Sequence, residues 1–195
     1  MAGNPKSTLR TGPFFIFCFG LLLLVYSVYG AAAISDQGTL EIRLKDHREA
    51  IGDFSRLNLT IDEIAISPTV GLKFWQVGWD HLVPSLQAID LTRYIADNSV
   101  RIFRGTVNAG SFDAVHLKLK AVDGILKKER RNAKVKNLLG PVRLNFEILP
   151  QGQTLIILDL VVLDMSDHPP RAYELGVKGY ELYTNGKLID KIPPG

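Results

Sequence analysis

The chain has little cysteine, and the residues after its N-terminal segment have almost equal numbers of basic and acidic side chains. Its one cysteine among 195 residues, Cys18, lies inside an N-terminal apolar run, so the residues after it hold no thiol for a disulfide or a thiolate zinc site. Of the 23 basic residues, Lys6 and Arg10 belong to the N-terminal segment, which leaves 21 against 20 acidic residues. A nucleic-acid-binding surface needs a one-sided basic excess, so we expect no nucleic-acid partner.

Charge is also missing from a long N-terminal stretch, because no charged residue lies between Arg10 and Asp36. The apolar run Phe14–Ala33 matches the roughly 20 residues that span a bilayer and exceeds the roughly 7 to 15 residues of a signal-peptide core. The sequence therefore predicts one transmembrane helix near residues 12–33, retained in the mature protein.

The flanks of this segment predict its orientation. Lys6 and Arg10 favour a cytoplasmic N-terminus, which places the rest of the chain in the periplasm or outside the cell. We assign residues 1–35 to a membrane anchor or signal segment and residues 36–195 to an extracytoplasmic domain. The alternative is a secretory signal peptide cleaved after the small residues Ala31–Ala33.

After Asp36 the dominant pattern is alternation of apolar and polar residues, which puts successive side chains on opposite faces of a sheet. In the second alternating segment the phase slips at Asp62-Glu63, which is typical of a β-bulge. The predicted strands include 39–44, 56–66, 115–119 and 142–148. We expect their apolar phase to be buried, with core residues Leu57, Leu59, Leu117, Leu119, Phe146, Leu158 and Leu160.

Two C-terminal segments have distinct patterns. Thr154–Leu163 is almost continuously apolar, which predicts a central strand covered on both faces. Tyr180–Ile189 contains Asn185-Gly186, which is typical of a two-residue hairpin turn. Only Ile89–Ala96 suggests a short helical turn. The expected fold class is therefore all-β, an antiparallel β-sandwich preceded by one N-terminal transmembrane helix.

The order of these segments resembles an uncharacterised family of secreted bacterial and archaeal β-sandwich domains, domain of unknown function 4382. The resemblance implies a β-sandwich and export, and it supplies no catalytic residue. Two places depart from the family pattern: the turn Asp46-His47-Arg48, where a small residue and proline are more usual, and a basic insertion after Gly124. The resemblance rests on Gly38–Asp46, Leu57–Ile66, Gly78-Trp79, Ala88–Leu91 and Asn108–Leu117.

No set of residues predicts catalysis or a cofactor site. The four histidines have no metal-motif spacing, and no Gly-x-Ser-x-Gly element is present. We therefore expect a protein that is not an enzyme, with no catalytic residue, no cofactor and no metal site. Carboxylates near strand ends could bind calcium, but their commoner role is to close turns. These carboxylates are Asp46, Asp53, Asp90, Asp97 and Asp113.

Two segments are candidate contact sites for a partner or a membrane. The first is basic and lies between a strand that ends near Leu126 and a strand that begins near Val142. It could contact lipid headgroups or an acidic partner, or it could be a solvated hairpin tip. The second holds Trp75 and Trp79, which suit an interface, a cap on the core or a sugar-stacking platform. The basic candidates are Lys127, Lys128, Arg130, Arg131, Lys134 and Lys136.

These features predict a membrane-anchored, non-enzymatic accessory or structural subunit. Its outer domain would pack on a larger membrane protein complex, because an anchor and a rigid domain together raise the effective concentration of each contact. The alternative is a secreted or periplasmic module with a cleaved signal peptide that binds a ligand or carbohydrate.

Overall fold

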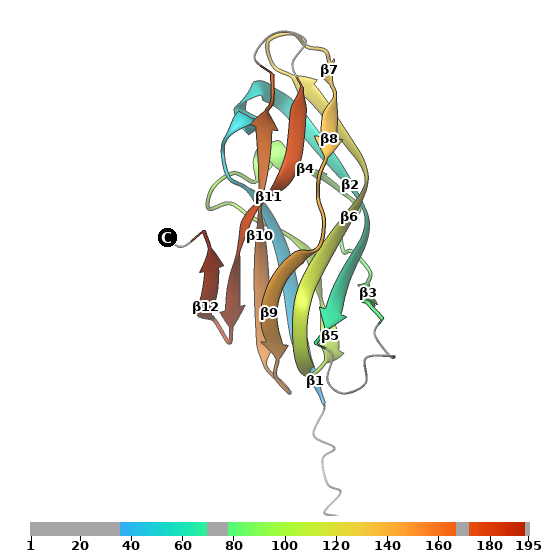
Figure 1. The fold of residues 1–195 in the computed structure, drawn as a ribbon, viewed down its shortest axis with the longest axis vertical. Helices are drawn as coiled ribbons and strands as arrows, with labels where there is room; N and C mark the ends of the chain where they lie inside the picture. Colours follow the sequence, from blue (N-terminus) through green and yellow to red (C-terminus); the bar gives the residue numbers. More distant parts are fainter. Residues whose placement is uncertain (1–35, 70–77, 167–171, 194–195) are drawn as a thin grey trace, which may run out of the picture. The chain divides into compact units, whose positions relative to one another are not determined.

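The computed structural model describes residues 36–69, 78–166 and 172–193, and these residues are nearly all in β-strands (Figure 1). The short helices are single 3-10 turns, η1 (Ala50–Asp53) and η3 (Leu91–Arg93). The strands are β1 (Gln37–Asp46), β2 (Phe54–Pro68), β3 (Asp80–Leu82), β4 (Ala88–Asp90), β5 (Val100–Asn108), β6 (Gly110–Leu126), β7 (Asn132–Ala133), β8 (Val135–Asn137), β9 (Val142–Ile148), β10 (Gln153–Asp164), β11 (Tyr173–Thr184) and β12 (Lys187–Ile192).

The strands form two six-stranded sheets that enclose one core, a β-sandwich architecture (Figure 1). The first sheet has the order β12-β11-β10-β1-β5, and β8 also pairs with β11. The second sheet has the order β3-β2-β6-β7, with β4 paired to β2 and β9 paired to β6. The expected all-β class is therefore confirmed.

The prediction that all strand pairs are antiparallel is wrong for the first sheet. β1 runs parallel to β10, and β8 runs parallel to β11. The turn before β10 brings the chain back to the end at which β1 starts, where the Thr39 amide donates to the Gly152 carbonyl at 2.8 Å. Alternation in a sequence defines the faces of a strand but does not define the direction of its neighbours.

The predicted core is confirmed except at one position. Leu57, Leu59, Leu117, Phe146, Leu158 and Leu160 are all buried. Leu119 is half-buried and packs against the edge of the core. The pairing of β2 with β6 shifts register on both sides of the Ile61–Leu119 pair, and these irregularities turn Leu119 partly out of the core.

Local expectations from the sequence agree with the structure. The register of β2 shifts between Ile61 and Glu63, which confirms the bulge predicted at Asp62-Glu63. Asn185 and Gly186 have φ values of 50° and 79°, as a two-residue turn between β11 and β12 requires. The central position of β10 is also confirmed, because it lies between β1 and β11 and is buried on both faces from Leu158 to Val162.

The predicted anchor falls on residues 1–35, which lie outside the described residues. Within the described ranges, no helix has the length and apolar character needed to cross a membrane.

Candidate interaction surfaces

The basic segment follows the longest strand, β6. A turn closes after Leu126, whose amide donates to the Arg131 carbonyl at 3.0 Å, and the chain then pairs back onto β6 as β7. Beyond β7 the chain crosses to the first sheet, where β8 pairs with β11. The segment is therefore an exposed hairpin turn between β6 and β7 followed by a crossover between sheets, and not the single hairpin from Leu126 to Val142 that was one of the alternatives.

The six basic candidates do not lie in one group. Lys127, Lys128, Arg130 and Arg131 lie in the turn itself and are all exposed, and we call these four residues the basic turn. Lys134 lies between β7 and β8, and the Lys136 ammonium on β8 lies 3.1 Å from the Glu174 carboxylate. The structure therefore separates the crossover lysines from the basic turn.

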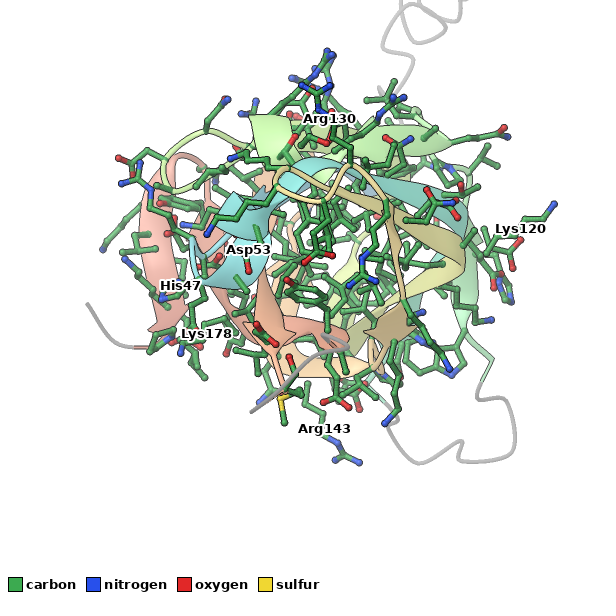
Figure 2. The ribbon with its side chains drawn as sticks, turned by 90° about the horizontal axis from the view of Figure 1, so that it is seen from above. His47, Asp53, Lys120, Arg130, Arg143 and Lys178 are labelled. Atoms are coloured by element: carbon green, nitrogen blue, oxygen red, sulfur yellow. The ribbon has the colours of Figure 1, made fainter. Side chains whose placement is uncertain are left out.

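Two of the four cations in the basic turn have a local partner. The Lys127 ammonium donates to the Gly52 carbonyl at 2.8 Å, and Arg131 pairs with Glu129. Across the described ranges, the side chains of Lys128 and Arg130 have no hydrogen-bond or ion-pair partner. Figure 2 shows Arg130 on the end of the domain that faces the viewer, so two charges of this turn are available to an external anion.

Of the two candidate tryptophans, the structure describes one. Trp75 lies outside the described residues. Trp79 is half-buried, and its ring centroid lies 5.9 Å from that of His116 on β6. Burial and then the neighbouring Lys118 charge lower the pKa of His116, which favours the neutral imidazole beside the indole. Trp79 therefore covers the outer face of the second sheet.

Sequence reasoning missed the most exposed apolar element, the edge strand β12. All six of its residues are exposed, including Leu188, Ile189 and Ile192 at 46%, 55% and 47%. β12 is the terminal strand of the first sheet, and within the described ranges its outer edge pairs with no other strand. Such an edge presents free amide and carbonyl groups to any extended chain. The sequence predicted the β11–β12 hairpin. It could not predict the exposure of β12, because exposure depends on which other elements pack against a strand.

Side-chain and backbone contacts add to the strand pairing that holds β12 against β11. The Tyr180 hydroxyl donates to Asp190 at 2.6 Å, and burial followed by this bond raises the pKa of Tyr180 to about 12. At Gly179 the backbones approach so closely that a Cβ atom would lie 1.6 Å from the Ile192 carbonyl oxygen. β12 is therefore exposed in its side chains but fixed in its backbone.

A polar pocket of about 340 Å³ lies beside β12 on the first sheet. Asp46, at the end of β1, and Asp159, on β10, both line it and are 0% and 8% exposed. One oxygen of each, Asp46 Oδ2 and Asp159 Oδ1, is buried without a hydrogen-bond donor in the described part of the chain. Burial, with a further contribution from the Asp159 charge, raises the pKa of Asp46 to about 6.

Basic side chains lie beside Asp159. His47 Nδ1 lies 3.1 Å from Asp159 Oδ2, and the Lys45 ammonium lies 3.9 Å from the same oxygen. Lys45 also donates to Glu181 at 2.8 Å. Of this set, sequence reasoning had singled out Asp46 as a possible calcium ligand, and Asp46 and His47 as part of a turn that departs from the family pattern.

In residues 36–69, 78–166 and 172–193, no group of three or more histidine, aspartate or glutamate side chains is placed to hold a metal ion. The pocket also lacks a serine, threonine or cysteine among its lining residues that His47 could activate. The charged groups that line the pocket can form hydrogen bonds and ion pairs.

The fold is a β-sandwich domain in which β12 forms an exposed edge of the first sheet. The chain belongs to the family described as Domain of unknown function (DUF4382), whose model matches residues 37–174. This match confirms the family resemblance found in the sequence. No curated protein and no solved structure gives a significant match. The matched range ends at the start of β11, so the β11–β12 hairpin lies almost wholly beyond it.

Proposed function

We propose that this protein is a membrane-anchored, non-enzymatic accessory subunit whose outer β-sandwich binds a larger membrane protein complex through β12. The observation that carries the proposal is that all six residues of β12 are exposed, with three large apolar side chains among them, on a backbone held by close packing at Gly179. Exposed apolar residues that cluster on one element mark protein contact sites more often than scattered ones do.

An edge strand supplies a specific mode of binding. An extended segment of the partner can add to β12 through main-chain hydrogen bonds, while Leu188 and Ile189 provide apolar contacts. Lys187 and Lys191 flank these residues and oppose indiscriminate pairing, as lysines do on many sheet edges. The N-terminal anchor would hold β12 near its partner and raise the effective concentration of the contact.

A second candidate function is a secreted module that binds a ligand or carbohydrate. The observation that favours it is the polar pocket, whose size falls within the usual range of roughly 300 to 1,000 Å³ for small-molecule sites. Its carboxylates and lysines would exchange hydrogen bonds with a hydroxylated ligand. A mature N-terminus at Ile34 and recovery in the soluble fraction would favour this function over the first.

The proposal is tested by purifying the full chain from membranes in mild detergent and identifying the co-purifying subunits by mass spectrometry. We expect stoichiometric membrane proteins with the wild type and their loss in the double variant Leu188→Glu/Ile189→Glu. The matched control is Val83→Glu/Leu86→Glu, which changes two exposed apolar residues elsewhere, at 83% and 42% exposure. Equal recovery of partners with both variants would exclude β12 as the contact.

A further inference from the structure

We infer that a cavity extending from Trp79 to β12 binds a neutral saccharide, with Trp79 as the aromatic part of its wall. The sequence left three roles open for this residue: an interface, a cap on the core and a sugar-stacking platform. The polar groups that line the same cavity favour the third role. This inference goes beyond the docking of β12 and depends neither on that docking nor on the N-terminal segment.

The cavity has a volume of about 590 Å³ and lies across the strands of the second sheet. Ser67 on β2 is opposite Ala114 on β6, and Ala114 is opposite Arg143 on β9, so these residues form a row. The small methyl group of Ala114 leaves the row hollow at its centre. Tyr180 and Asp190 complete the wall from the first sheet. The cavity is distinct from the polar pocket beside β12, since Tyr180 is the one described residue that lines both.

Trp79 forms the aromatic part of the wall. It directly precedes β3, whose first residue, Asp80, pairs with Ile66 on β2, so Trp79 lies at the level of Ser67, at one end of the row. The His116 ring is tilted by 57° against the indole and is not stacked flat on it. An indole offers a broad apolar face and one N–H donor, which suits the C–H face and the hydroxyl groups of a sugar ring.

Three polar side chains of the cavity are available to a ligand. In the described part of the chain, the side chains of Asp113, Arg143 and Asn145 make no hydrogen bond, and no ion pair joins Asp113 to Arg143. Arg143 projects from the side of the domain (Figure 2), so its guanidinium can close over a bound molecule. Asp190 is positioned by the Tyr180 hydroxyl, which donates to it at 2.6 Å, and its carboxylate has further lone pairs for a ligand.

This combination selects an uncharged ligand with many hydroxyl groups. Each hydroxyl both donates and accepts, so a polyol can satisfy the Asp113 carboxylate and the Arg143 guanidinium together. An anionic ligand would meet the like charges of Asp113 and Asp190, and a cationic ligand would meet that of Arg143. The volume falls within the roughly 300 to 1,000 Å³ of small-molecule sites. With the indole beside these groups, the ligand class is a neutral saccharide.

The experiment uses Trp79 as its own reporter. The chain has two tryptophans, so Trp75→Phe leaves Trp79 as the single source of indole fluorescence. The full chain is purified in a polyoxyethylene detergent, because a sugar-based detergent would compete for the cavity. It is titrated with neutral hexasaccharides of glucose, of mannose and of N-acetylglucosamine, and with the anionic hexamer of galacturonic acid. We expect a saturable change in Trp79 emission with at least one neutral hexasaccharide, and binding at least about tenfold weaker with the anionic hexamer.

Variants at the cavity test the assigned contacts. Asp113→Ala and Arg143→Ala should each weaken binding about tenfold or more, because each removes a hydrogen bond to a charged group. Trp79→Ala, followed by calorimetry, should also weaken binding, whereas Trp79→Tyr keeps an aromatic face and should retain most of it. Thermal unfolding of each variant checks that the fold is kept. The matched controls Asp97→Ala and Arg101→Ala remove one exposed charge of each sign elsewhere and should leave the affinity unchanged.

The outcomes separate this cavity from the other candidate sites. No binding of any neutral hexasaccharide at up to about 10 mM, or equal binding of the anionic hexamer, would overturn the inference. Binding that survives Asp113→Ala and Arg143→Ala but is lost in Asp97→Ala would assign the saccharide to the polar pocket and would also overturn it. Saccharide binding by a chain that co-purifies with no membrane subunit would support the inference while contradicting the docking of β12.

Discussion

Asp46 and Asp159 face the same pocket, and each buries one carboxylate oxygen that accepts no hydrogen bond within the described residues. The remaining oxygen of Asp46 accepts from the Arg48 amide at 2.8 Å, and that of Asp159 is paired with His47. Burial of an Asp46 oxygen that lacks a donor favours the protonated form of Asp46. This relationship explains why the pKa of Asp46 is raised, first by burial and then by the Asp159 charge.

We expect Asp46 to make the domain less stable as pH rises through the range 4 to 6. Its pKa is about 6 in the folded chain and 3.8 by default, so the folded state binds a proton more tightly than the unfolded state between these values. The stabilisation is fully present below about pH 4 and is lost above about pH 6, at a cost of roughly 2 to 3 kcal/mol. His47 opposes this effect and Glu49 adds to it.

Asp46→Asn tests this expectation. The amide oxygen can still accept from the Arg48 amide, and the neutral side chain removes a buried charge near Asp159. The variant should be more stable than wild type at pH 7 by roughly 1 to 3 kcal/mol and should lose this advantage near pH 4, as measured by urea unfolding at each pH. Asp97→Asn, at an exposed position of the same pocket, should leave the profile unchanged. A constant difference between pH 4 and pH 7 would contradict the assignment.

The half-buried position of Leu119 predicts a graded response along β6. Leu117→Asp should cost several kcal/mol, because the new charge would be buried without a partner. Leu119→Asp should cost clearly less, since its side chain can reach water. Thermal or urea unfolding measures both, with the exposed Lys120→Asp as a control that should change stability little. Equal costs at Leu117 and Leu119 would show that the register shifts do not expose Leu119.

Gly179 should be essential for the position of β12. In Gly179→Ala the new methyl group would lie 1.6 Å from the Ile192 carbonyl oxygen, so the end of β12 has to move away. We expect faster hydrogen exchange at Lys187–Ile192 and weaker partner binding. Gly176→Ala, where nothing lies within 4 Å of the added Cβ, is the matched control on the same strand. Unchanged exchange in Gly179→Ala would mean that β12 is not held by this contact.

The uncharged N-terminal run predicts retention in the membrane. We expect the mature protein to resist carbonate extraction and its intact mass to include residues before Ile34, since Phe14–Ala33 is long enough to span a bilayer. Recovery in the soluble fraction alone would show that the segment is a cleaved signal peptide.

The sequence by itself determined the features that depend on neighbouring residues. Alternation identified the strands and most of their buried faces, because side chains in a strand point to opposite sides in turn. Asn185-Gly186 defined the last hairpin, since few residue pairs adopt two positive φ values, and the phase slip at Asp62-Glu63 located a bulge. The family of the chain could also be recognised at this level.

Only the tertiary structure decided which strands are neighbours and what covers each face. The parallel pairing of β1 with β10 and the meeting of Asp46 with Asp159 join segments that are far apart in the chain, and no local pattern encodes such contacts. The sequence of β12 is that of an ordinary strand, yet all its residues are exposed in the structure, because exposure depends on which elements pack against a strand. The basic turn was visible as charge, yet its place at the far end from Gln37 came only from the length and direction of β6.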